Sequence, residues 1–134
     1  MAQPKGAVDR AGELKDWVSV VEQLAHQVES WCQQRNWAVS ISERRISESA
    51  YGEYAVPELM IRSPSGTVYL EPVARDVAGA RGRVDLLAWP SLTRMMLIRR
   101  GKDWVLQTDS GLDWPEPWGP QAFEKIVGLI NAAA

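Results

Sequence analysis

The sequence predicts an α+β domain with an N-terminal helix, a curved antiparallel meander sheet of five to six strands and a C-terminal helix. Three observations lead to this class. Apolar residues recur at helical spacing near both ends of the chain. The middle of the chain alternates apolar and polar residues in short runs, and turn residues separate these runs. Short connections make successive strands antiparallel neighbours, and helices grouped at the ends are typical of α+β domains.

The first helix is predicted from about Asp9, a suitable N-cap, to Gln34. Its apolar residues step by three and four without a break: Leu14, Trp17, Val18, Val21, Leu24, Ala25, Val28, Trp31 and Cys32. Residues 1–8 precede this pattern and are expected to form a flexible tail. Residues 9–134 are then a single domain, which suits a chain of this length.

Six strands are expected at 37–42, 55–62, 67–73, 84–89, 94–99 and 104–108, the first of them able to run on to Ser47. Pro57 lies within the second strand and indicates an edge or a bulge there, because proline cannot donate a ladder hydrogen bond. Gly66 and Gly101 can supply the positive φ that the turns before the third and sixth strands need.

Two strands of the expected sheet, VDLLAW at 84–89 and MMLI at 95–98, are apolar on both faces. A strand with one wet face alternates cleanly, so these two are expected to be covered on both sides. Either the two helices lie on opposite faces of the sheet, or part of one face meets another copy of the chain or a partner protein. We favour the second interpretation.

Composition excludes several kinds of chemistry. The chain has one cysteine, Cys32, and one histidine, His26, so an internal disulfide, a zinc finger and an iron–sulfur cluster all lack ligands. His26 lies beside the apolar stripe of the first helix and is expected to face solvent. No cofactor is expected. No apolar run of membrane-spanning length and no secretory signal is present, and cysteine usage favours the cytoplasm.

Charge is unevenly spread along the chain. The net charge is −2, but residues 75–102 hold seven basic residues against two acidic ones, a net of +5 that leaves −7 elsewhere. This basic middle permits a local anion site, but it is weaker than the balance typical of nucleic-acid binding, so a nucleic-acid partner is not expected. The seven tryptophans suit a core as well as an interface.

Three carboxylates, Glu71, Asp85 and Asp109, lie on or near predicted strands. Carboxylates can hold magnesium and activate water, as in hydrolytic nuclease-like sites. The strand after Asp85 reads RMMLIRR and lacks the acid-x-lysine pattern of such sites. Asp85 can instead pair with Arg83 or with an arginine on a neighbouring strand.

The glycine-rich loop RDVAGARGR, residues 75–83, is a candidate anion site. Arg75, Arg81 and Arg83 can clamp a phosphate or a carboxylate, although the loop lacks the pattern of a phosphate-binding P-loop. The alternative is a solvated turn whose arginines pair with acids elsewhere in the chain.

The stretch DWPEPWGP, residues 113–120, leads into the last helix, predicted at 120–131. Gly119 as N-cap and Pro120 as first helical residue place Trp118 and Phe123 at the two positions of a hydrophobic staple. Trp114 has no such role and is a candidate ligand-binding residue.

Three acids of the same region, Asp109, Asp113 and Glu116, make this loop acidic. They could face the basic loop at 75–83, either as an internal clamp or as the rim of a cleft.

From the sequence we therefore expect a non-enzymatic, cytoplasmic domain that binds a protein or associates with itself. The alternative is an anion-binding or magnesium-dependent hydrolytic domain that uses the Arg75–Arg83 loop and the strand carboxylates.

Overall fold

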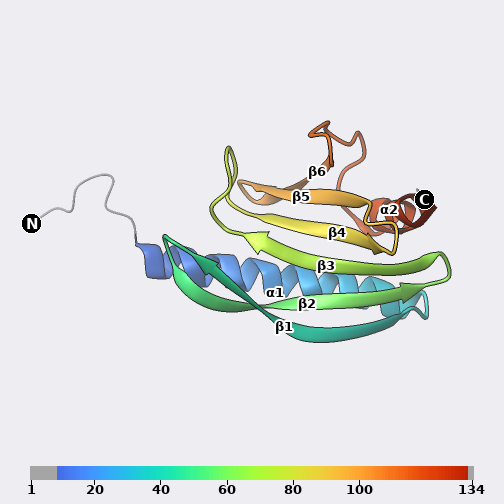
Figure 1. The fold of residues 1–134 in the computed structure, drawn as a ribbon, viewed down its shortest axis with the longest axis horizontal. Helices are drawn as coiled ribbons and strands as arrows, with labels where there is room; N and C mark the ends of the chain where they lie inside the picture. The colour runs from blue at the N-terminus through green and yellow to red at the C-terminus, as the bar shows by residue number, and fades with distance from the viewer. Residues whose placement is uncertain (1–8, 133–134) are drawn as a thin grey trace, which may run out of the picture.

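The computed structural model describes residues 9–132 and has the predicted α+β architecture (Figure 1). One sheet holds six strands in chain order, and each neighbouring pair is antiparallel. The elements are α1 (Arg10–Gln34), β1 (Ala38–Glu48), β2 (Gly52–Ser63), β3 (Gly66–Ala74), β4 (Arg83–Trp89), β5 (Arg94–Arg100), β6 (Asp103–Thr108) and α2 (Pro120–Ala132). The expected tail at 1–8 lies outside the described residues.

The first helix begins as its sequence predicts. The side chain of Asp9 accepts a hydrogen bond from the backbone nitrogen of Gly12 at 2.9 Å, which satisfies one free donor of the first turn. The predicted apolar stripe is the buried face of α1, while His26 faces solvent with its side chain 79% exposed. In the described range neither helix is both long enough and apolar enough to cross a membrane.

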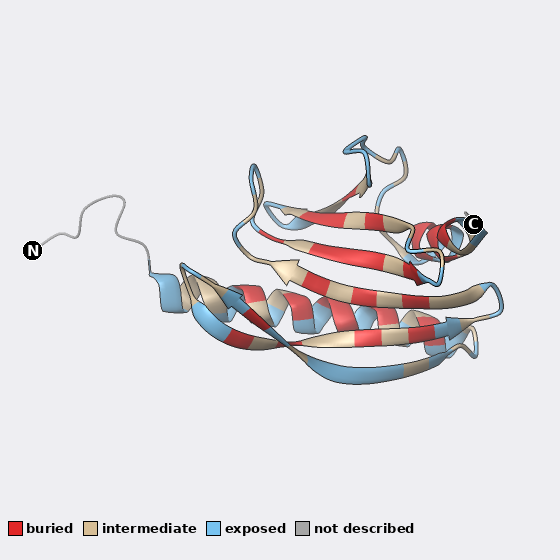
Figure 2. Cartoon of the chain, in the orientation of Figure 1, coloured by how far each residue is buried: buried red, intermediate tan, exposed pale blue. Residues whose placement is uncertain are grey.

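Both helices pack against the same face of the sheet. The rings of Trp31 on α1 and Phe123 on α2 lie 5.7 Å apart, and one apolar cluster joins both helices to the sheet. Figure 1 shows the two helices behind the strands, and Figure 2 shows buried and less buried residues alternating along β3. The opposite face, which we call the uncovered face, carries no helix formed by residues 9–132. Of the two arrangements expected from the apolar strands, the one with helices on opposite faces is therefore wrong.

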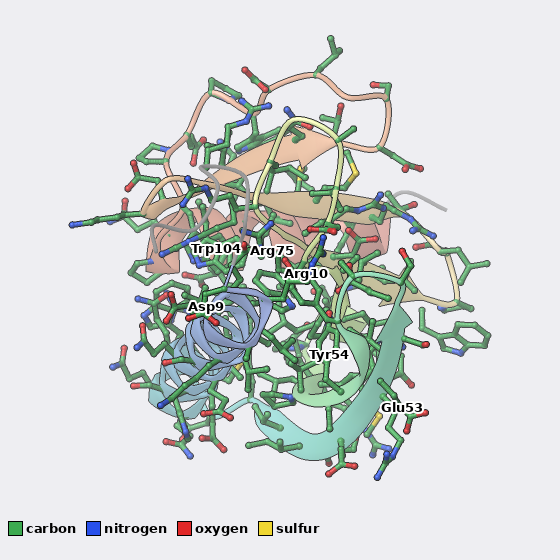
Figure 3. All side chains as sticks on the ribbon, turned by 90° about the vertical axis from the view of Figure 1, so that its left-hand side faces the viewer. Asp9, Arg10, Glu53, Tyr54, Arg75 and Trp104 are labelled. Carbon is green, nitrogen blue, oxygen red and sulfur yellow. The ribbon has the colours of Figure 1, made fainter. Side chains whose placement is uncertain are left out.

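The sheet curves around α1, so strands far apart in the sheet approach the same helix. β1 and β2 contact α1 on one side. On the other side Trp104 of β6 lies against Trp17 of α1, with 6.1 Å between ring centroids. Figure 3 looks from the N-terminal end of α1 and shows Arg75 and Trp104 beyond the helix on this second side.

Two prolines divide β2 from β3. The ladder between these strands ends at the pair Leu59 and Leu70. If the register continued, Pro57 would lie opposite Pro72, and neither could donate a backbone hydrogen bond. Pro57 still pairs with Glu43 of β1. The predicted edge at Pro57 is thus a local separation inside an otherwise continuous sheet.

The start of α2 follows the predicted pattern. The backbone nitrogen of Phe123 donates to the carbonyl of Gly119 at 2.9 Å, as expected when Gly119 caps the helix. The rings of Trp118 and Phe123 meet edge to face at 6.0 Å. This contact is the predicted staple, and it fixes the direction from which residues 114–118 approach the helix.

Candidate functional site: a groove along the first helix

A groove of about 620 Å³ lies between α1, the β5–β6 hairpin and the segment that precedes α2. Three tryptophans line it, and we call it the tryptophan groove. Its lining residues are Val20, Gln23, Leu24, Gln27, Arg99, Lys102, Asp103, Trp104, Val105, Leu106, Trp114, Pro115, Glu116, Pro117 and Trp118.

A second hollow of about 400 Å³, the arginine hollow, lies beside the first towards the start of α1. It is lined by Glu13, Asp16, Trp17, Ser19, Val20, Gln23, Arg75, Arg81, Arg99 and Gly101. Val20, Gln23 and Arg99 line both hollows, so the two form one elongated depression.

One face of α1 forms the wall of this depression. Its lining residues from Glu13 to Gln27 are spaced by three or four, the spacing of one helical face. Over this range the helix rises about 21 Å at about 1.5 Å per residue. An extended chain advances about 3.3 Å per residue, so this wall matches roughly six residues of extended peptide.

The segment that carries Trp114 is tied to the edge of the sheet. The backbone nitrogen of Trp114 donates to the carbonyl of Leu106 at 2.8 Å, and the nitrogen of Thr108 donates to the carbonyl of Leu112 at 2.8 Å. These bonds cover part of the outer edge of β6 and place Trp114 against the core. Trp118 is held separately by the ring of Trp31, 5.2 Å away.

The indole nitrogens of Trp114 and Trp118 are buried, and neither has a hydrogen-bond partner within the described part of the chain. Trp17 differs, because its indole nitrogen donates to the hydroxyl of Tyr54 at 3.2 Å. A buried donor without an acceptor costs about 1–3 kcal/mol, so most proteins pair such groups. Two unpaired donors on one five-residue segment therefore set this part of the groove apart.

Arg99 lies where the two hollows meet. Its guanidinium carbon is 5.2 Å from the ring centroid of Trp104, its partner across the β5–β6 hairpin. Its backbone is fixed by the loop at residues 75–83, which we call the arginine loop. The backbone nitrogen of Arg99 donates to the carbonyl of Gly82 at 2.8 Å, and the backbone nitrogen of Arg81 donates to the carbonyl of Arg99 at 2.9 Å. Burial lowers the pKa of Arg99, the sign of a partly desolvated cation.

The predicted ligand residue Arg75 is held by other parts of the protein. Its guanidinium lies 3.3 Å from the carboxylate of Glu13 on α1 and 3.2 Å from that of Asp76, and it stacks over the ring of Tyr51. The carboxylate of Glu48 accepts bonds from the backbone nitrogens of Arg75 and Asp76, both at 2.9 Å. These contacts tie the loop to α1 and to the β1–β2 turn.

The other two predicted arginines separate. Arg81 lines the arginine hollow together with Arg75, whereas Arg83 lies on the uncovered face. There it holds the carboxylate of Asp85 through two hydrogen bonds of 2.8 Å each. The three arginines therefore do not converge on a single anion site.

The strand carboxylates gather on the uncovered face. Asp85 is 2% exposed, lies opposite Glu71 in the ladder, and also accepts a hydrogen bond from Arg94 at 3.1 Å. Arg94 in turn lies 3.9 Å from Asp109. Burial, followed by the charge of Glu58, raises the pKa of Glu71. Both oxygens of Asp85 are bound by arginines, and residues 9–132 contain no cluster of three potential metal ligands.

The two remaining acids of the segment before α2, Asp113 and Glu116, do not pair with the arginine loop. Asp113 accepts a hydrogen bond from the amide of Gln107 at 3.0 Å. Glu116 pairs with Lys125 of α2. Glu116 nevertheless lines the tryptophan groove, so the rim of a cleft, rather than a clamp onto residues 75–83, describes its position.

Of the residues that line the depression, the sequence indicated Trp114, Arg75 and Arg81 as candidates and did not indicate Gln23, Arg99, Lys102 or Trp104. Gln23 belongs to the polar face of an amphipathic helix, and such faces usually meet water. Arg99 and Trp104 form a cross-strand pair, a signal that the hairpin register at Gly101 does contain.

Comparisons with models of protein families, with curated proteins and with solved structures found no match. A proposal about function must therefore rest on the geometry of the described residues.

Proposed function

We propose that this chain is a non-enzymatic protein-binding domain whose tryptophan groove and arginine hollow together hold an extended segment of a partner protein. The single cysteine, Cys32, is buried and free, which suits a partner met in the cytoplasm.

The observation that carries this proposal is the pair of unpaired indole donors of Trp114 and Trp118. An extended peptide presents carbonyl oxygens at regular intervals, and these are acceptors for such donors. The nitrogens are covered by protein, so the 114–118 segment must shift for a ligand to reach them. The hydrogen bonds formed then offset a cost that the free protein already carries.

The shape of the site supports a peptide. The depression follows α1 over the length of about six extended residues and is open along its side. Apolar walls from Leu24, Trp104 and Trp118 alternate with polar groups, the usual composition of a site that fixes orientation with a few polar contacts.

The test begins with selection of peptides from a random displayed library against the whole chain. Selected peptides are then titrated into protein labelled with nitrogen-15 in its indole rings. We expect the indole resonances of Trp104, Trp114 and Trp118 to move. The resonance of Trp89, which is 56% exposed and lines neither hollow, should stay in place.

A matched pair of variants locates the binding. Gln23→Trp fills the junction of the two hollows and should abolish binding, whereas Gln33→Trp adds the same ring at an exposed position of the same helix and should not. If no peptide is selected, or if selected peptides move only the resonance of Trp89, the proposal is wrong.

Self-association through the uncovered face is a second candidate. This face carries half-buried apolar side chains from four strands: Met60, Tyr69, Leu87 and Met96. Static light scattering should show a mass that rises towards a dimer with concentration, and Met96→Lys should reverse the rise while Gln33→Lys should not. A constant monomer mass would remove this candidate.

The hydrolytic alternative has less support. Glu71, Asp85 and Asp109 do share the uncovered face, but a metal ion would have to displace Arg83 and Arg94 from Asp85. For the anion-binding alternative, only Arg81 of the three predicted arginines is free of an ion pair within the described chain. Arg75 pairs with Glu13 and Asp76, and Arg83 pairs with Asp85.

A further inference from the structure

Three cations of the depression have no acidic partner. No carboxylate of the described chain lies within 4.0 Å of Arg81, Arg99 or Lys102. Of the four acids that line the depression, Glu13 binds Arg75 and Glu116 binds Lys125, whereas the exposed Asp16 and Asp103 form no ion pair within the described chain. The depression therefore holds three cations and two acids outside any ion pair of the described residues.

Arg99 is the central member of this set. Arg81 and Lys102 are exposed, so water screens their charge, but Arg99 is half-buried against Trp104. A cation withdrawn from water is costly unless an anion or hydrogen-bond acceptors replace the lost hydration. No carboxylate of the described chain lies within 4.0 Å of Arg99, and the charge of Asp103 only partly opposes the effect of burial on its pKa.

The geometry around Arg99 is also prepared for a carboxylate. Stacking on Trp104 covers one face of the guanidinium and leaves its edge, with its fork of N–H donors, available. A carboxylate binds such a fork through two parallel hydrogen bonds. The backbone bonds to Gly82 and Arg81 fix the strand that presents it.

We propose that the bound segment is acidic, with an Asp or Glu side-chain carboxylate seated on Arg99 while neighbouring carbonyls accept from the indoles of Trp114 and Trp118. This inference rests on the proposed peptide-binding function and names its ligand chemistry. Lys102, which lines the tryptophan groove, and Arg81, which lines the arginine hollow, attract flanking acids and speed association. Two exposed acids of the depression, Asp16 and Asp103, favour a segment with isolated acids over a continuous acidic run.

Three hexapeptides test the ligand class. The first is acetyl-(Glu-Ala)₃-amide, the second is acetyl-(Gln-Ala)₃-amide, and the third is acetyl-(Gln-Ala)₃ with a free C-terminal carboxylate. At low ionic strength we expect the Glu peptide to bind at least about tenfold more tightly than the neutral amide, since a factor of ten needs only about 1.4 kcal/mol. Tight binding of the third peptide alone would support a carboxylate site but assign the carboxylate to a chain end.

A matched pair of variants assigns the effect to Arg99. Arg99→Gln should remove the preference for Glu over Gln, whereas Arg100→Gln, the same change at the exposed neighbouring position, should leave the preference within about twofold. Indole spectra of both variants in the free state check that Trp104 keeps its position.

The outcomes distinguish failure of the acidic ligand from failure of peptide binding itself. Equal binding of the Glu and Gln peptides, with shifts at Trp114 and Trp118, would overturn the acidic ligand and leave peptide binding intact. Absence of any indole shift with all three peptides, together with failure of the library selection, would overturn both.

Discussion

Gly82 lies directly under the indole ring of Trp17. A Cβ atom built on Gly82 would stand 2.1 Å from Cζ3 of Trp17, a distance that no real structure tolerates. The backbone of Gly82 also has a φ of 150°, a conformation that residues with a side chain rarely adopt. The arginine loop can therefore approach α1 closely only because position 82 is glycine.

Gly82→Ala should consequently destabilise the domain. The methyl group must push away a ring that is 3% exposed and that forms the floor of the arginine hollow. We expect a loss of about 2–4 kcal/mol in the free energy of unfolding, from combined overpacking and backbone strain. Gly79→Ala is the control: it also has positive φ, but open space surrounds it. Urea denaturation measures both, and equal losses would mean that the contact with Trp17 has no cost.

Asp85→Asn should be costly, whereas Glu71→Gln should not. Asp85 is buried and neutralises Arg83 and Arg94, so removing its charge leaves Arg83 unpaired and Arg94 with only the more distant Asp109, at a cost of about 3 kcal/mol. Burial and Glu58 already raise the pKa of Glu71, so an uncharged side chain at this position relieves an unfavourable charge.

Chemical denaturation at pH 7 should rank the two variants on opposite sides of the unmodified protein, or show Glu71→Gln close to it. The reverse ranking would indicate that Asp85 is kept for chemistry and that its ion pairs add little. Magnesium should leave the melting temperature unchanged, because arginines already bind both oxygens of Asp85. A ligand that binds only the folded state would raise the melting temperature.

The fold could be predicted from the sequence because local patterns determine its elements. Residues close together in the chain produce the helical spacing of α1 and the alternation of the strands. The staple between Trp118 and Phe123 is also a local contact. The side of the sheet on which each helix packs depends on contacts between distant residues, such as Trp31 with Phe123. No local pattern contains that information, so the sequence left both arrangements open.

The candidate site could be predicted only in part, for a related reason. Arg83 and Asp85 lie two residues apart on one strand, so their side chains point to the same face of the sheet. This spacing predicts that Arg83 pairs with Asp85 and lies away from Arg75. The proposed role of Arg99 depends on the absence of a carboxylate within 4.0 Å of its guanidinium in the described chain. Whether a cation forms an ion pair is a property of the folded molecule, because its partner can be an acid far away in the sequence.

Cys32 should make the domain sensitive to alkali. Burial raises the pKa of its thiol from 9.0 to about 11, so the folded state favours the neutral form. The stability that this provides is fully present below about pH 9 and is lost as the pH rises through 11. The contribution of Cys32 to the free energy of unfolding should fall by on the order of 2 kcal/mol over that range.

The measurement compares the unmodified protein with Cys32→Ala at several pH values. Tyr51 and Tyr54, whose pKa values burial also raises, are common to both proteins and cancel in the comparison. The stability difference between the two proteins should shrink as the pH rises. A difference that stays constant between pH 8 and 11 would contradict an effect of the buried thiol.

Replacing single indole N–H groups tests the unpaired donors directly. In 3-benzothienylalanine a sulfur atom replaces the N–H of tryptophan and the shape of the ring is nearly kept. At Trp114 or Trp118 this change should leave stability equal or raise it by up to about 1–3 kcal/mol, because an unsatisfied buried donor disappears. At Trp17 the same change should lower stability by about 1 kcal/mol, because the hydrogen bond to Tyr54 is lost. Peptide binding should weaken for the first two variants and persist for the third. Loss of stability at all three positions would show that the donors of Trp114 and Trp118 are paired in solution, and the groove would then lose the feature that most favours a ligand.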